Sequence, residues 1–189
     1  GCSSPLVMQM LDSIIKKADA LAEIVTVLHE IGSRHAMAIT VRPVELVELL
    51  PAARERVGSQ YQGKVEFDVP PHLGVLGNDT LLLELFENQI ENGWKFNTSE
   101  VPTVKFVARR ILDRTRVRVA DNGIGLDPKT QGLFELFRRH TDQFPGTGVG
   151  LALVKQAVEK QGGFIVVHPP LPGEGAVFVV DLPYAGVNL

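Results

Sequence analysis

The sequence predicts an α/β fold: a two-layer sandwich of helices and a mixed sheet, preceded by a long N-terminal helix. Three observations support this prediction. Helix-forming and strand-forming segments alternate through residues 41–189. Residues 5–34 repeat apolar side chains at three- and four-residue steps, as an amphipathic helix does. The 189 residues are 44% hydrophobic and 22% charged, which is typical of a chain that buries a core.

The N-terminal helix is predicted to carry an apolar seam. It would be about twice as long as an average helix, and a seam of this length favours packing against a helix of a partner chain. Packing on its own globular domain is the alternative. We expect residues 1–40 to form this dimerisation-type helix and a hinge, and residues 41–189 to form the globular domain. The seam residues are Leu6, Met10, Ile14, Leu21, Val25 and Leu28.

The globular domain is predicted to begin with a helix. Pro43 suits a first helical position, and the helix would run through Arg56, with Pro51 kinking or shortening it. A strand over residues 65–69 would then end at two prolines.

The later elements follow the same alternation. Asn78 at an N-cap position predicts a helix over 79–96. Two strands are expected to form a hairpin joined at Asp113 and Arg114. The predicted strands are 104–112, 116–120, 164–167 and 176–182, and a helix is predicted over 151–160.

Charge and hydropathy exclude several classes of partner. The net charge of -3 gives no basic field for a phosphate backbone, so we expect no nucleic-acid partner. No run approaches the ~18 apolar residues that span a bilayer, so this segment is expected to make no membrane contact. The one cysteine, Cys2, cannot form an internal disulfide, which suits a reducing compartment. We therefore expect a cytoplasmic location.

Three segments contain residues suited to binding a nucleotide. In the first, Asn88 and Asn92 lie four residues apart on one predicted helix face, with Lys95 three residues further on. Amide oxygens suit magnesium, and a lysine neutralises phosphate. Taken alone, two asparagines on a helix are more often solvated or capping residues.

The second segment is Asp-Asn-Gly-Ile-Gly-Leu, residues 121–126, directly after a predicted strand. Asp121 could accept the exocyclic amine of adenine, and the glycines let the backbone approach the base. Alternatively, this segment forms a simple turn with no role in binding. In the third segment, a glycine-rich loop over 146–150 runs into a helix, where amides and the helix dipole favour phosphate. Its spacing fits neither the dinucleotide fingerprint nor the phosphate loop that ends in Gly-Lys-Ser or Gly-Lys-Thr.

A fourth segment lies between the second and third. Phe134 and Phe137 could anchor a short helix from which Arg138 and Arg139 point outward, and the position predicts a short lid over residues 141–145. A surface helix with a basic end is the alternative.

Taken together in this order and spacing, these segments resemble the four sequence boxes of sensor histidine kinases. The patterns are Asn-x-x-x-Asn, Asp-x-Gly-x-Gly, Phe-x-x-Phe and Gly-x-Gly-x-Gly-Leu, and residues 134–163 look like the phytochrome-type branch. The resemblance covers about residues 41–182. It implies the Bergerat (GHKL) sandwich that is shared with gyrase, the MutL repair protein and a heat-shock chaperone.

The resemblance implies a site for ATP and Mg²⁺. Asn92 would hold the metal and Asn88 would lie beside it, while Asp121 would bind adenine. Arg138 or Arg139 would steady the γ-phosphate during transfer. The other residues expected to border the nucleotide are Lys95, Phe96, Gly123, Gly125, Leu126, Phe137, Gly146, Thr147, Gly148, Gly150 and Leu151.

The residue at position 88 bears on the chemistry. The hydrolysing relatives place a glutamate there as a general base, whereas asparagine cannot abstract a proton, so Asn88 favours transfer over hydrolysis. Glu87 is turned by about 100° around the helix and is a weaker candidate for contact. Gly93 and Trp94 depart from the family pattern, and a helical glycine costs about 1 kcal/mol, so we expect a packing requirement there.

The phosphoacceptor is not found among the recognised boxes. His29 begins a His-Glu-Ile run, but the basic residue, the proline and the second helix that follow in the family are missing. We therefore expect the acceptor helix upstream of this sequence, with a homodimer and a response regulator as the partners of the whole kinase. A degenerate kinase that acts as a nucleotide-binding scaffold and a Bergerat-type ATPase are the alternatives.

Overall fold

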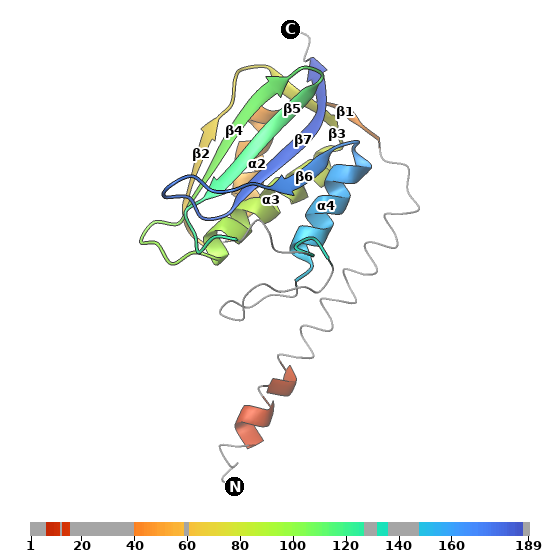
Figure 1. The fold of residues 1–189 in the computed structure, drawn as a ribbon. Coiled ribbons are helices and arrows are strands. Elements are labelled where there is room, and N and C mark those ends of the chain that lie inside the picture. The colour runs from red at the N-terminus through yellow and green to blue at the C-terminus, as the bar shows by residue number, and fades with distance from the viewer. Residues whose placement is uncertain are drawn as a thin grey trace.

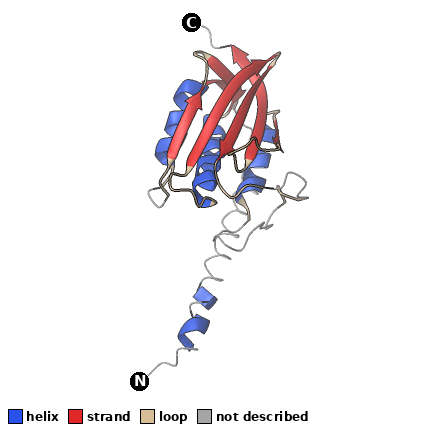
Figure 2. Cartoon of the chain, turned by 60° about the vertical axis from the view of Figure 1, so that its left-hand side comes forward, coloured by secondary structure: helices blue, strands red, loops and turns tan. Residues whose placement is uncertain are grey.

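The computed structural model describes residues 7–11, 13–15, 40–58, 61–126, 132–135 and 148–186. Within these ranges, one mixed sheet is covered on one face by three helices (Figures 1 and 2), which confirms the predicted α/β sandwich. The helices are α2 (Leu46–Arg56), α3 (Asp79–Lys95) and α4 (Gly150–Lys160).

The described strands pair in the order β1-β3-β7-β5-β4-β2, with β6 also pairing with β7. Only β2 and β4 run parallel in this part of the chain, and the other pairs are antiparallel. The strands are β1 (Arg42–Glu45), β2 (Lys64–Asp68), β3 (Leu73–Gly77), β4 (Thr103–Ile111), β5 (Arg114–Asp121), β6 (Phe164–Val167) and β7 (Val177–Gly186).

The prediction that Pro43 opens a helix was wrong. Pro43 lies in β1 and is opposite Leu76 in the antiparallel register with β3. Because β1 is an edge strand, a residue without an N–H is tolerated there. The helix begins instead at Leu46, and Pro51 does not shorten it, since α2 continues to Arg56.

Strand β3 was not predicted. Four of its five residues are buried, so the sequence Leu-Gly-Val-Leu-Gly lacks the alternation of polar and apolar residues that marks a half-buried strand. The segment is also short. The hairpin between β4 and β5 was predicted, but its turn is Leu112-Asp113 instead of Asp113-Arg114. Leu112 adopts a φ of 57° and has an 84% exposed side chain. A positive φ is uncommon for leucine, so residue type alone could not predict that the turn lies at this position.

Helix α3 forms as predicted and carries the asparagines and the lysine of the first predicted segment. Asn78 caps it by accepting a hydrogen bond from the Leu81 N–H at 3.2 Å. One side of the helix is buried against the sheet, where Phe86 meets the ring of Phe106 edge-on at 5.9 Å. The helix ends at Lys95, and the N–H of the C-cap residue Phe96 donates to the Asn92 carbonyl.

The glycine inside α3 is explained by close packing. A Cβ at Gly93 would lie 2.4 Å from Val104 Cγ2 and 3.2 Å from Asp121 Cβ. The absence of a side chain therefore lets α3 approach the start of β4 and the end of β5. The adjacent Trp94 is buried and donates from Nε1 to the Lys64 carbonyl at 3.3 Å.

The predicted N-terminal helix is only partly covered by the described residues. Residues 7–11 and 13–15 are helical, and the seam residues Met10 and Ile14 are 60% and 62% exposed. The other seam positions and the predicted hinge through residue 39 lie outside the described residues. No helix in the described part of the chain is long and apolar enough to cross a membrane.

We predict that Gly93→Ala destabilises the chain. The contact with Val104 should cost about 1–3 kcal/mol, which exceeds the gain of about 1 kcal/mol from helix propensity. Urea unfolding measures the difference. In a double-mutant cycle, Val104→Ala should relieve part of this cost, since it removes the methyl group in the way. Strict additivity of the two changes would contradict the packing explanation.

Candidate nucleotide-binding site

Asp121, the last residue of β5, has a carboxylate that is fixed from one side. Its Oδ1 accepts the backbone N–H groups of Gly123 and Ala176, each at 2.9 Å. Its Oδ2 receives no hydrogen bond within the described residues and is available to a ligand. Burial raises the pKa of this carboxyl, and the two backbone hydrogen bonds only partly oppose that rise.

The backbone around Asp121 extends the β5–β7 pairing beyond the strand ends. The Asp121 N–H donates to the Ala176 carbonyl at 3.1 Å, and the Gly175 N–H donates to the Asp121 carbonyl at 2.7 Å. Both neighbouring segments therefore hold the carboxylate in place. The end of β5 thus carries a fixed hydrogen-bond acceptor at the residue that was expected to bind the adenine amine.

The C-terminal half of α3 brings the polar residues of the first predicted segment together. Asn92 Nδ2 donates to Asn88 Oδ1 at 2.9 Å, so the two amides are ordered by each other. Lys95 lies 5.5 Å from the centroid of the Phe96 ring. Gly93, which lies between Asn92 and Lys95 on the helix, contacts the Asp121 Cβ, so this part of α3 packs on the end of β5.

The N-terminus of α4 faces the same asparagines. A Cβ at Gly150 would lie 2.7 Å from Asn88 Oδ1, so the first turn of α4 directly abuts α3. Val149 at the N-cap provides no side-chain hydrogen bond, and the first turn has no acidic residue. The N–H groups of a first helical turn have no partner within the helix, and together with the helix dipole they favour an anion such as phosphate.

The residues present fit a magnesium–nucleotide complex. Asn92 donates through Nδ2, and no hydrogen bond to its Oδ1 forms within the described residues, so this hard oxygen is available as a metal ligand. The described residues include no cluster of three or more His, Cys, Asp or Glu. This donor set suits Mg²⁺, which keeps several waters and shares phosphate oxygens instead of occupying a cage made wholly of protein.

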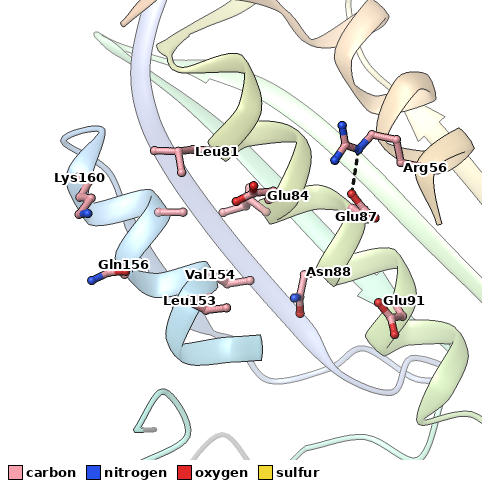
Figure 3. Close-up of a pocket in the computed structure, with 12 residues that line it drawn as sticks. Arg56, Leu81, Glu84, Glu87, Asn88, Glu91, Leu153, Val154, Gln156 and Lys160 are labelled. Carbon is pink, nitrogen blue, oxygen red and sulfur yellow. Dashed lines mark hydrogen bonds and ion pairs between the residues drawn. The ribbon is translucent and has the colours of Figure 1, made fainter. Parts of the chain in front are cut away.

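A separate groove of about 290 Å³ runs between α3 and α4. Figure 3 shows Asn88 and Glu91 on its α3 side and Leu153 and Val154 on its α4 side. Asp121 does not line this groove. The groove therefore adjoins the predicted nucleotide site only through Asn88. Glu87, which sequence reasoning left as a weaker candidate, faces the groove and pairs with Arg56 Nε at 3.0 Å.

The structure places part of the predicted site and leaves part untested. Gly93 lies against Asp121, Gly123 lies against the Phe96 carbonyl, and Gly150 lies against Asn88. Asn92 and Lys95 lie on α3, whereas Gly125, Leu126, Gly148 and Leu151 lie in the β5 loop or at the start of α4. The predicted residues Phe137, Arg138, Arg139, Gly146 and Thr147, and the lid over 141–145, lie outside the described residues.

Phe134, one of the two phenylalanines expected to anchor a short helix, packs on the sheet. It packs edge-on against Phe178 of β7, with ring centroids 6.5 Å apart. Residues 132–135 form a turn, closed by a hydrogen bond from the Glu135 N–H to the Gly132 carbonyl at 3.0 Å, where a short helix was expected.

Two residues of the site region were missed by sequence reasoning. Asn97 and Asn122 form a side-chain hydrogen bond of 2.7 Å that joins the end of α3 to the β5 loop. Asn122 was interpreted only as part of a glycine turn. The available signal was an asparagine directly after each of two predicted binding residues, Phe96 and Asp121.

The fold and the site define an ATP-binding α/β sandwich domain, and comparison with known proteins gives its family. Residues 77–186 match the family model described as "Histidine kinase-, DNA gyrase B-, and HSP90-like ATPase". The chain belongs to this family.

The relatives are histidine kinases and phytochromes. Cyanobacterial phytochrome A of Nostoc sp. is 42% identical over 59% of this chain and 15% of its own length. The signal transduction histidine-protein kinase BaeS of Escherichia coli is 32% identical over 90% of this chain and 38% of its own. The structure of the mycobacterial sensor histidine kinase MprB has a TM-score of 0.64 at 26% identity, over 78% of this chain and all of that one. The chain thus spans well under half of these two curated relatives.

We predict that Asp121→Asn greatly weakens nucleotide binding without unfolding the chain. The asparagine Oδ1 can still accept the two backbone N–H groups, but an amide donor replaces the free oxygen that would accept the adenine amine. A charge-assisted hydrogen bond of this kind corresponds to about a 10- to 100-fold change in Kd. Isothermal titration with ADP and Mg²⁺ measures it, and unchanged affinity would contradict the assignment.

The pH dependence provides a second test of Asp121. Its raised pKa means that ADP binding by the wild-type chain should weaken as pH falls through a range above that of an ordinary aspartate. The folded state also binds the proton more tightly than the unfolded state. Asp121→Asn should therefore increase the free energy of unfolding at pH 7, and this gain should disappear below the unfolded pKa. A decrease in the free energy of unfolding of Asp121→Asn at pH 7 would show that burial does not dominate the pKa of Asp121.

Proposed function

We propose that this chain is the ATP-binding catalytic domain of a sensor histidine kinase and transfers the γ-phosphate of ATP to a histidine. One observation carries the proposal: within the described residues, the Asp121 oxygen that accepts no hydrogen bond, the Asn88–Asn92 pair and the N-terminus of α4, whose N-cap side chain makes no hydrogen bond, lie around α3. These groups match the chemistry of adenine, a magnesium ion and phosphate respectively. The relatives' names, which include histidine kinases, support the same assignment.

The residues have distinct roles in this proposal. Asp121 orients the base by accepting the adenine amine, and the N–H groups at the start of α4 hold phosphate oxygens. Asn92, with Asn88 beside it, would hold Mg²⁺, which supplies charge neutralisation for the transferred group when bound. Lys95 contributes a fixed positive charge near the phosphates.

The transfer itself exchanges one bond to phosphorus for another. An imidazole nitrogen of the acceptor histidine forms a bond to the γ-phosphorus, the bond from that phosphorus to the ADP oxygen breaks, and ADP leaves with the electron pair. Catalysis of this step depends mainly on positioning and electrostatics. Because Asn88 cannot remove a proton from water, the site favours transfer over hydrolysis.

The wider arrangement is part of the proposal. Residues 1–40 would be a dimerisation-type helix with a hinge, and residues 41–189 the catalytic domain of a homodimeric kinase. The acceptor histidine would lie on a helix outside this sequence, and a response-regulator aspartate would receive the phosphate. Arg138 or Arg139 would steady the γ-phosphate during the transfer. A cytoplasmic location is part of the same proposed kinase role.

Phosphate transfer can be measured directly with labelled ATP. The chain is supplied with an acceptor domain, either in trans or in a longer chain that includes it. We expect Mg²⁺-dependent label on histidine, stable to base and labile to acid. Asn92→Ala should reduce the rate about 100-fold, in line with the loss of an electrostatic group in a transfer site. His29→Ala should retain the label.

The alternatives give different outcomes in the same assay. Steady release of inorganic phosphate without labelled histidine would contradict transfer and favour a Bergerat-type ATPase. Nucleotide binding with neither product would favour a regulatory scaffold. Loss of the label in His29→Ala would place the acceptor within this sequence.

A matched pair of lysines tests the phosphate side of the site. Lys95 ends α3 beside the asparagines, whereas Lys105 is exposed on β4. We predict that Lys95→Ala weakens ADP binding by about 3- to 10-fold, as expected for one partly solvated charged contact, and leaves adenosine binding unchanged. Lys105→Ala should affect neither. Equal effects of the two changes on ADP binding would show that only net charge matters.

A further inference from the structure

Asn97 and Asn122 connect the two sides of the proposed nucleotide site. Asn97 directly follows Phe96 at the end of α3, and Asn122 directly follows Asp121 at the end of β5. The Asn97 Nδ2 group donates to Asn122 Oδ1 at 2.7 Å and to the Gly93 carbonyl at 3.0 Å. We call this pair of residues the asparagine clamp.

Asn122 makes further hydrogen bonds that fix the clamp in the fold. Its Oδ1 also accepts the Thr103 N–H at 2.7 Å, and its Nδ2 donates to the Val101 carbonyl at 3.1 Å. Its backbone N–H donates to the Thr103 carbonyl at 3.2 Å, and its carbonyl accepts from Ser99 Oγ at 2.9 Å. Asn122 thus makes hydrogen bonds along the segment that connects α3 to β4. Such a fully satisfied polar network rigidifies the segment that it joins.

A second contact reinforces the same junction. The Ile124 N–H donates to the Phe96 carbonyl at 3.0 Å, and a Cβ at Gly123 would lie only 2.3 Å from that oxygen. The β5 loop therefore lies directly on the C-terminal end of α3. This junction sets the separation between Asp121, on the nucleobase side, and Lys95, on the phosphate side.

We propose that the asparagine clamp is a positioning element that fixes this separation, so that a ligand carrying both a base and phosphates is bound across the junction. The inference rests on the proposed nucleotide-binding function. A ligand that contacts both sides benefits from their preorganised spacing, whereas a nucleoside that contacts only the base side does not. Loosening the clamp therefore weakens ADP binding more than adenosine binding.

Three substitutions separate this role from a general loss of stability. Asn97→Asp keeps the Oδ1 acceptor for the Ser99 N–H at 2.9 Å but replaces the donor of the clamp with an acceptor. Asn122→Asp keeps the Oδ1 acceptor that receives Asn97 Nδ2 and the Thr103 N–H. Ser99→Ala is the matched control, because it removes a hydrogen bond to Asn122 outside the clamp.

The test compares the Kd of ADP with Mg²⁺ and the Kd of adenosine, the latter by displacement of a fluorescent nucleotide, alongside the unfolding midpoint. For Asn97→Asp we expect ADP binding to weaken roughly tenfold, the equivalent of one buried hydrogen bond, and adenosine binding to change less than twofold. Asn122→Asp keeps the clamp hydrogen bond but loses the one from Nδ2 to the Val101 carbonyl, so it should weaken ADP binding less than Asn97→Asp does. Ser99→Ala should not change either Kd.

Each contrary result has a defined meaning. Equal weakening of ADP and adenosine in Asn97→Asp would show a merely structural role and overturn the proposal, as would equal damage by Asn97→Asp and Asn122→Asp. Failure of the wild-type chain to bind adenosine would also overturn it, because the base side must bind independently. Failure of the wild-type chain to bind ADP would instead defeat the proposed function.

Discussion

The close approach of α3 to the ends of β4 and β5 is the constraint on which the candidate site depends. Gly93 makes this approach possible, since a side chain there would overlap Val104 and crowd Asp121. The same contact brings the helix that carries Asn88, Asn92 and Lys95 against the strand end that carries the buried carboxylate. A chemically suitable set of residues without this packing would remain distributed over two separate elements.

The buried carboxylate shows how this arrangement trades stability for function. Burial disfavours the charged form of Asp121 and raises its pKa, and two backbone N–H groups compensate only in part. The Asp121 oxygen that accepts no hydrogen bond within the described residues can accept one from a donor such as an amino group on a bound base. By contrast, Asp181 on β7 is more deeply buried than Asp121, and both of its oxygens are paired, with Nε and Nη2 of Arg116 at 2.9 and 2.7 Å, which fits a structural role.

Sequence reasoning predicted the parts of the structure that have local signals. Helix α3, with its cap at Asn78, and the position of Asp121 at a strand end both follow from periodicity and turn chemistry. Strand β3 and the strand at Pro43 could not be predicted, because their pairing is decided by distant partners. The clamp between Asn97 and Asn122 was missed for the same reason: it joins residues 25 positions apart. The need for a glycine in α3 was anticipated, but its partners on the sheet were not.

The central claim is that a nucleotide binds across the junction of α3 and the β5 loop, and backbone amide NMR with ADP and Mg²⁺ tests it most directly. We expect the largest chemical-shift changes at Asp121, Gly123 and Asn92 and in the first turn of α4. Shift changes confined to the outer groove around Glu84 and Lys160, or no changes at saturating ADP, would contradict it.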